Sequence, residues 1–155
     1  MDGCKVVSLR NSILEAIGNL ATNGSNCEKM IESGILLPLI EKILPRNLES
    51  AKPDKETLEL HKVLASPLLC NLTKPRTTQD VFLTIGVVPL VVYWMNVESD
   101  DEQPQKGAIE VLANFSTNET AVNEFAQLPN FVSGLENATG MIVKCNIVID
   151  RAIAE

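Results

Sequence analysis

Residues of the types that carry out chemistry are scarce in this sequence of 155 residues. It contains one histidine, His61, and its four cysteines are scattered with no Cys-x-x-Cys pair, so we expect no metal site. There is no glycine-rich phosphate loop, and no nucleophile stands beside a base in a patterned constellation. The sequence therefore predicts a protein that is not an enzyme and that needs no cofactor.

An excess of positive charge is also missing. Thirteen Lys and Arg residues are outnumbered by twenty Asp and Glu residues, which gives a formal net charge of −7. A nucleic-acid-binding protein needs a basic face for the phosphates, so this balance argues against nucleic acid as a partner. It favours a basic protein partner, although solubility alone would also explain it.

Neither a leader nor a membrane span is expected. The N-terminus has no apolar stretch of the signal-peptide kind. The most apolar run, Val81 to Met95, is shorter than the about 20 residues that cross a bilayer. Scattered cysteines suit a reducing compartment, so we expect the cytoplasm, with the nucleus as the open alternative.

Aromatic residues make up only 4% of the sequence, whereas hydrophobic residues make up 45%. A core must therefore be built mainly from Leu, Ile, Val and Ala. At this length, the chain is expected to form a single domain, residues 1–155.

What the sequence does contain is an internal repeat. Three segments end alike: Ser12–Thr22, Val63–Thr73 and Gly107–Thr117. Aligned on Asn19, Asn71 and Asn114, the copies are 52 and 43 residues apart. The longer spacing is explained by a polar insertion with two prolines at 45–56, which is typical of a surface loop.

Each copy is predicted to contain a short first helix, such as Asn26–Ser33. Its start is expected at a capping box, in which a Ser or Thr is followed three residues later by an acid. Ser25 and Glu28 have this spacing in one copy, and Thr77 and Asp80 have it in the next.

Two further helices complete the predicted unit. A glycine in the left-handed conformation, Gly34 or Gly86, is expected to end the short helix, and a second helix is predicted at Ile35–Leu44 and Val87–Asn96. The third and longest helix carries the asparagine.

The third helix is clearest in the first copy, at Val7–Ala21. Ile13, Ala16, Ile17 and Leu20 recur there at intervals of three and four residues, which places them on one helix face. No long stretch alternates with a period of two, so a sheet is not expected. The predicted fold class is all-α.

These residues resemble the armadillo repeat, with the HEAT repeat as the nearest structural alternative. The stretches that carry the resemblance are Gly34-Ile-Leu-Leu-Pro-Leu-Ile, Ala16-Ile-Gly-Asn-Leu-Ala, Gly86-Val-Val-Pro-Leu-Val, Leu69-Cys-Asn-Leu-Thr and Leu112-Ala-Asn-Phe-Ser. The resemblance covers about residues 7 to 135 and depends on the spacing of the motifs rather than on any one of them.

The resemblance implies a right-handed α-α superhelix of about three repeats preceded by an incomplete one. The expected parts are a partial first repeat with its third helix at 7–22, a repeat at 24–74 that includes the loop 45–56, a repeat at 76–117, and a divergent last repeat at 118–155. A last long helix is expected at Met141–Ala154.

In this family the third helices line a concave groove in which asparagines bind the backbone of an extended peptide. The candidate partner-binding residues are Asn11, Glu15, Asn19, Lys62, Asn71, Lys106, Glu110 and Asn114. A side-chain amide both donates to and accepts from a peptide bond, so such a row suits a strand of any sequence. The alternative is that each asparagine caps or packs its own or a neighbouring helix.

Nuclear-import adaptors of this family place a tryptophan four residues before the asparagine. Here those positions hold Glu15, Pro67 and Glu110, and the only tryptophan, Trp94, is expected to be buried in a second helix. A receptor for nuclear signals is therefore not predicted. Glu15 and Glu110 would make the groove acidic and favour a basic partner, or they form an ordinary solvated face.

Two residues of the middle copy need their own predictions. Pro67 lies within the third helix and is expected to kink it, because proline lacks an amide donor and clashes with the preceding turn. His61 is predicted to be a surface or groove residue without a catalytic partner.

Helix 7–22 has no short and second helix before it to cover its apolar side. Ile13, Leu14, Ile17 and Leu20 do not resemble the polar outer face of a terminal repeat, which suggests a piece of a longer array or self-association through this end. The leading function is a noncatalytic scaffold or adaptor that binds protein in the third-helix groove. The alternative is a structural or self-association segment of a larger protein, without a ligand of its own.

Overall fold

The computed structural model describes residues 3–34, 37–38, 55–97 and 102–145. Within these residues all regular structure is helical, so the predicted all-α class is confirmed. The helices, in chain order, are α1 (Gly3–Leu20), α2 (Gly24–Glu32), α4 (Lys55–Val63), the π-helical η1 (Leu64–Leu69), α5 (Cys70–Leu72), α6 (Arg76–Thr84), α7 (Val87–Asn96), α8 (Gln103–Phe115), α9 (Glu119–Gln127) and α10 (Phe131–Cys145).

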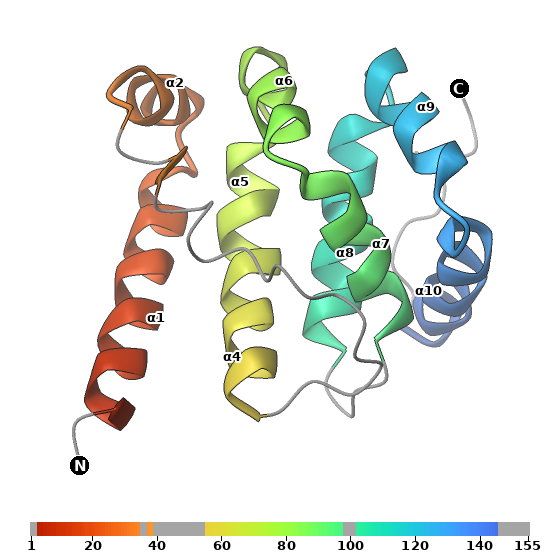
Figure 1. The fold of residues 1–155 in the computed structure, drawn as a ribbon, viewed down its shortest axis with the longest axis horizontal. Coiled ribbons are helices and arrows are strands. Elements are labelled where there is room, and N and C mark those ends of the chain that lie inside the picture. The colour runs from red at the N-terminus through yellow and green to blue at the C-terminus, as the bar shows by residue number, and fades with distance from the viewer. Residues whose placement is uncertain (1–2, 35–36, 39–54, 98–101, 146–155) are drawn as a thin grey trace.

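The long helices lie side by side in the order of the chain. Figure 1 shows α1, then the continuous helix formed by α4, η1 and α5, then α8, while the short helices α2, α6 and α9 lie across one end of this row. The chain contacts agree, because η1 packs against α1 on one side and α8 on the other, and α7 packs against α8 and α10.

The predicted helix Val87–Asn96 is confirmed, since α7 has these bounds. Gly34 and Gly86 have φ angles of +68° and +81°, so the prediction of left-handed glycines is also confirmed. Such angles are strained for residues with a Cβ atom, which explains why glycine ends the short helix at both positions.

Part of the second copy lies outside the described residues. This holds for most of the helix predicted at Ile35–Leu44 and for the loop predicted at 45–56. The end of that loop was placed wrongly, because Lys55 and Glu56 already belong to α4. Glu56 lies in the first turn, where its negative charge interacts favourably with the helix dipole.

The predicted capping boxes are wrong. The N-cap of α2 is Asn23, whose side chain accepts a hydrogen bond from the Ser25 amide at 3.1 Å, so Ser25 lies inside the helix. Asn118 caps α9 in the same way, accepting from the Ala121 amide at 3.2 Å. The cap therefore lies four residues after the repeat asparagine in the first and third copies.

In the second copy this cap position is Pro75, which offers no side-chain hydrogen bond. Thr77 does not cap α6. Its hydroxyl donates instead to Glu28 Oε1 at 2.8 Å, which connects α6 to the neighbouring short helix α2.

Pro67 was predicted to kink the middle long helix, and the structure shows a change of helix type at this position. It falls within η1, a π-helical stretch between α4 and α5. A π-type turn is one of the known ways in which a helix accommodates the hydrogen bond that proline cannot make.

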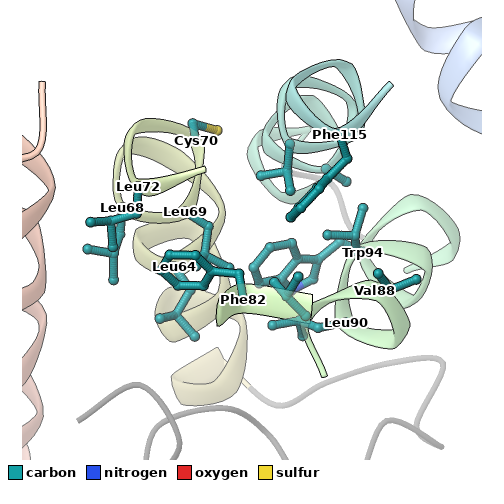
Figure 2. Packing of buried hydrophobic residues seen from close by; sticks show 14 of the residues in the cluster. Leu64, Leu68, Leu69, Cys70, Leu72, Phe82, Val88, Leu90, Trp94 and Phe115 are labelled. Carbon is teal, nitrogen blue, oxygen red and sulfur yellow. The ribbon is translucent and has the colours of Figure 1, made fainter. Parts of the chain in front are cut away.

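The core lies between the long helices and α6 and α7. Figure 2 shows Leu64 and Leu69 of η1 on the side of the helix that faces Phe82 of α6 and Trp94 of α7. Trp94 is fully buried in a second helix, as predicted. Its indole Nε1 has no hydrogen-bond partner within the described part of the chain.

The expectation for His61 is wrong, because this residue is only 1% exposed. Its ring contacts Tyr93 and Trp94 edge-on, with centroid distances of 5.4 and 6.0 Å. His61 occupies a core-facing position of the long helix, where packing against α7 decides its location.

The C-terminal part of the chain differs from its prediction. A separate long helix was expected to start at Met141, but α10 runs without a break from Phe131 to Cys145. The predicted residues after Cys145 lie outside the described part.

Helices α7 and α10 cross closely at Gly134. A Cβ atom at this position would lie 2.5 Å from Asn96 Nδ2 and 3.0 Å from Met95 Cβ. The Asn96 amide also donates to the Asn130 carbonyl at 3.0 Å, so it is held in place at this crossing. The absence of a side chain at residue 134 is therefore required by the packing.

Replacing Gly134 by alanine is expected to lower the free energy of unfolding by about 1–3 kcal/mol, because α7 and α10 must move apart. Gly140 is the matched control, since a Cβ atom there meets nothing within 4 Å. Gly140→Ala should raise the free energy of unfolding by about 0.5–1 kcal/mol, as expected for alanine in a helix. Denaturant unfolding followed by circular dichroism measures both changes, and equal effects of the two variants would contradict the close crossing.

Candidate interaction surface

The repeat asparagines join neighbouring long helices. The side-chain amide of Asn71 donates to the carbonyl of Gly18 at 3.0 Å, and that of Asn114 donates to the carbonyl of Cys70 at 2.8 Å. In both cases the acceptor is the residue just before the previous repeat asparagine. The two bonds are thus equivalent, and they agree with the alignment made from the sequence.

A second pair of bonds runs in the opposite direction. The residue eight positions after one repeat asparagine donates to the main-chain carbonyl of the next. Cys27 Sγ lies 3.6 Å from the Asn71 carbonyl oxygen, and Gln79 Nε2 lies 2.8 Å from that of Asn114. Burial raises the pKa of the Cys27 thiol, which keeps its proton available for these contacts.

These contacts leave the three asparagines in different situations. Asn71 is only 7% exposed, and its side-chain oxygen accepts from Lys74 Nζ at 2.9 Å. Asn114 is half-buried and its amide also reaches Thr73 Oγ1 at 3.0 Å. Asn19 is exposed. Of the two roles open from the sequence, helix packing accounts for the amide groups of Asn71 and Asn114.

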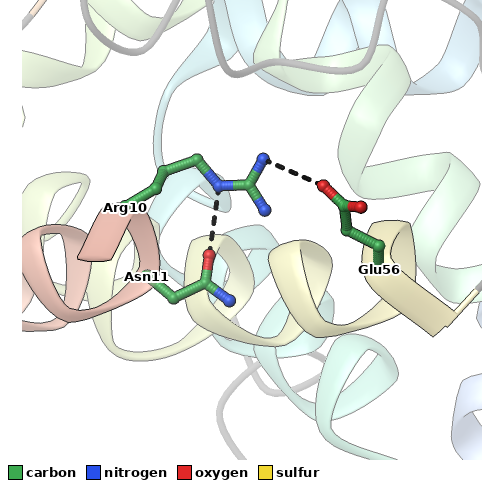
Figure 3. Close-up of polar contacts among 3 residues, drawn as sticks. All are labelled: Arg10, Asn11 and Glu56. Carbon is green, nitrogen blue, oxygen red and sulfur yellow. Dashed lines mark hydrogen bonds and ion pairs between the residues drawn. The ribbon is translucent and has the colours of Figure 1, made fainter. Parts of the chain in front are cut away.

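The other candidate residues lie along the long helices. Asn11 accepts from Arg10 Nε at 3.1 Å, and Arg10 lies 3.8 Å from Glu56 in an ion pair that links α1 to α4 (Figure 3). Lys62 pairs with Glu59 at 2.8 Å on the same helix. Such partly exposed pairs contribute little to stability.

In the third copy, Lys106 pairs with Glu102 at 3.1 Å. Glu15 and Glu110 occupy equivalent positions on α1 and α8, and both are exposed. Among the candidate residues, Glu15, Asn19 and Glu110 are therefore the ones with exposed side chains.

An apolar stripe on α1 is the most exposed hydrophobic feature of the described residues at this end. Leu9, Ile13 and Leu20 are 63%, 46% and 57% exposed. Ala16 lies between them and is also exposed. We call these four residues the α1 stripe.

The sequence indicated an apolar end at this helix but misassigned part of it. Leu14 is fully buried and Ile17 is half-buried, because their side of α1 faces η1. The sequence analysis did not include Leu9 in the apolar end, since this residue lies one turn before the matched motif. Leu9 is four residues before Ile13, a spacing that places both side chains on the same helix face.

A shallow depression of about 310 Å³ adjoins the C-terminal end of the stripe, lined by Leu20, Asn26, Lys29, Met30 and Ser33. It extends the exposed apolar surface from α1 onto α2. Exposed apolar area of this kind marks interaction sites more often than isolated surface leucines do.

Within the described ranges, no group of three or more His, Cys, Asp or Glu side chains could hold a metal ion. Among the same residues, no single helix has the length and hydropathy to cross a membrane. The pair α6 and α7 passes together by length and composition, but it is bent by 86°.

Comparison of the chain with protein-family models, with curated proteins and with solved structures gives no match.

Proposed function

We propose that this chain is a noncatalytic protein-interaction module, an armadillo-like right-handed superhelix that binds a partner protein through the α1 stripe. The observation that carries the proposal is the exposure of Leu9, Ile13 and Leu20 on one face of a helix whose other face is packed. Side-by-side long helices joined by equivalent asparagine bonds support the superhelix.

Covering the α1 stripe would contribute favourably to binding. Covering three large aliphatic side chains removes apolar area worth about 25 cal/mol per Å² from water. A helix face of this kind suits a helical partner better than an extended peptide.

The test replaces the three large side chains together, as Leu9→Gln, Ile13→Gln and Leu20→Gln. Capture from cell extract followed by mass spectrometry should show about tenfold or greater loss of the specific partner, because the apolar contact is lost. Circular dichroism should remain unchanged, since glutamine is a good helix former and these positions are exposed.

The matched control is Val122→Gln with Val132→Gln, which removes exposed apolar side chains at the other end of the row of helices. Partner recovery should persist in this control. Equal recovery by the stripe variant and the wild-type chain would contradict the proposal.

A second candidate function is the binding of an extended, basic segment along the third helices. It is favoured by the exposed carboxylates of Glu15 and Glu110 at equivalent positions. This candidate would be supported if the variant of the α1 stripe still captures the partner, whereas the double variant Glu15→Lys and Glu110→Lys does not.

A further inference from the structure

Both ends of the Gln79 side-chain amide form hydrogen bonds inside the protein. Nε2 donates to the main-chain carbonyls of Thr73 and Asn114, at 3.0 and 2.8 Å. Oε1 accepts from Asn118 Nδ2 at 3.2 Å. Gln79 and Asn118 are both buried, so these amide groups depend on one another rather than on water for their hydrogen bonds. Gln79 therefore connects α6 to the ends of two long helices and to the residue that precedes α9.

Asn118 has two roles at once, because it is also the N-cap of α9. Its Oδ1 accepts from the Ala121 amide at 3.2 Å, while its Nδ2 donates to Gln79 and, at 3.4 Å, to Asp80 Oδ1. Oδ1 and Nδ2 belong to one planar amide group, so the bonds from Nδ2 to α6 fix the direction of the cap oxygen. The cap of α9 is thus oriented by a helix of the preceding copy.

The junction between the first and second copies is built differently. Cys27 occupies the position equivalent to Gln79, and its thiol donates to the Asn71 carbonyl but carries no amide oxygen. The cap position of the next short helix is Pro75, which makes no side-chain hydrogen bond. Within the described ranges, the cap of a short helix is therefore bonded to the preceding short helix only between α6 and α9.

We propose that Gln79 is a positioning residue that couples two short helices, so that displacement of α6 releases the cap of α9. When α6 moves away, Asn118 loses the acceptor of its Nδ2 group, and its Oδ1 is no longer held toward the Ala121 amide. The first turn of α9 then opens together with α6. Displacement of α2 has no such effect on α6, because Pro75 provides no side-chain cap that α2 could orient.

Hydrogen exchange of single amides in the full chain, followed by NMR, tests this coupling. Gln79→Met removes the donor and the acceptor while keeping a long, unbranched side chain that suits a helix. The amides of Ala121 and Val122 should then exchange about fivefold or more faster relative to those of α10, because the cap has lost its support.

The matched control on the same helix is Thr77→Ala. The Thr77 hydroxyl donates to Glu28 of α2, so this bond points to the other neighbour of α6. Exchange in the first turn of α9 should change by less than about twofold in this variant, as is usual for a surface substitution.

Asn118→Ser tests the same bond from the side of α9. Serine caps a helix about as well as asparagine does, but it has no amide group to donate to Gln79. Exchange of the Ala121 amide should therefore rise by about fivefold or more although a capping oxygen remains. The matched variant Asn23→Ser, at the exposed cap of α2, should change the exchange of the Ser25 amide by less than about twofold.

The double variant Gln79→Met with Asn118→Ser separates positioning from a general loss of stability. If Gln79 acts through Asn118, Gln79→Met has no further effect on α9 once serine is present, so the two effects do not add. Additive effects would overturn the inference, as would unchanged exchange of Ala121 in Gln79→Met or an equal effect of Thr77→Ala. If Gln79→Met does not fold, the two serine variants decide alone, and equal effects of both would refute the coupling.

Discussion

Replacement of Asn71 and Asn114 together by alanine is expected to lower the free energy of unfolding by about 2–6 kcal/mol, since losing one buried hydrogen bond and leaving its partner unsatisfied costs about 1–3 kcal/mol. Both amides donate to main-chain carbonyls of the neighbouring long helix, at 3.0 and 2.8 Å. Alanine cannot replace these bonds, and Asn71 is too buried for water to do so freely. Denaturant unfolding of the double variant and of both single variants measures the effect.

The matched control is Asn19→Ala, which removes the equivalent but exposed side chain. Its free energy of unfolding should change by no more than about 0.5 kcal/mol, as is usual for surface substitutions. The single effects of Asn71 and Asn114 should not add simply, because Asn114 bonds to the residue beside Asn71. A double variant that unfolds like the wild type but loses a peptide ligand would favour groove binding over helix packing.

Trp94→Ala is expected to lower the free energy of unfolding by about 3–5 kcal/mol, the usual range for removing a large aromatic side chain from a core. Trp94 is fully buried and packs with Phe82, Leu69 and Phe115, which come from three different helices (Figure 2). The cavity would therefore lie where α6, η1 and α8 meet. Circular dichroism against denaturant measures the loss, and it needs no tryptophan signal.

Trp94→Phe is the informative control. It keeps an aromatic ring and removes the indole Nε1, which is buried without a hydrogen-bond partner among the described residues. The volume loss is destabilising, while removing an unpaired polar group offsets part of it, so the cost should be below about 1.5 kcal/mol. A cost equal to that of alanine would mean that the indole nitrogen is bonded in solution.

The helices were largely predictable because their signals are local. Gly86 ends α6 and begins α7 through its own backbone preference, and α7 is an unbroken apolar segment, so both of its ends were predicted correctly. The first capping box failed because Asn23 caps α2 from an earlier position, and the second failed because the Thr77 hydroxyl donates to Glu28 on the neighbouring helix. An acid at the right spacing does not show which of two possible caps forms.

The positions of His61 and Leu14 could not be derived in the same way. Whether a residue on a long helix faces a neighbouring helix or the solvent depends on the rotation of one copy relative to the next. The periodicity of a single helix gives no information about this rotation. His61 was therefore placed on the surface although it packs against Tyr93. The sequence motif identified the repeat asparagines correctly. Only the hydrogen-bond distances in the structure show that Asn71 and Asn114 bond to carbonyl groups of the chain itself rather than being free for a ligand.

The paired bonds around each repeat asparagine have a consequence for how the copies can differ in length. Each junction is closed within ten residues of the earlier copy, from Gly18 to Cys27 and from Cys70 to Gln79, and the acceptor in each of these four paired bonds is a main-chain oxygen. A thiol and an amide serve as donors at the same position for this reason. Residues added elsewhere in a copy leave the register between neighbours untouched, so spacings of 52 and 43 residues coexist in one array.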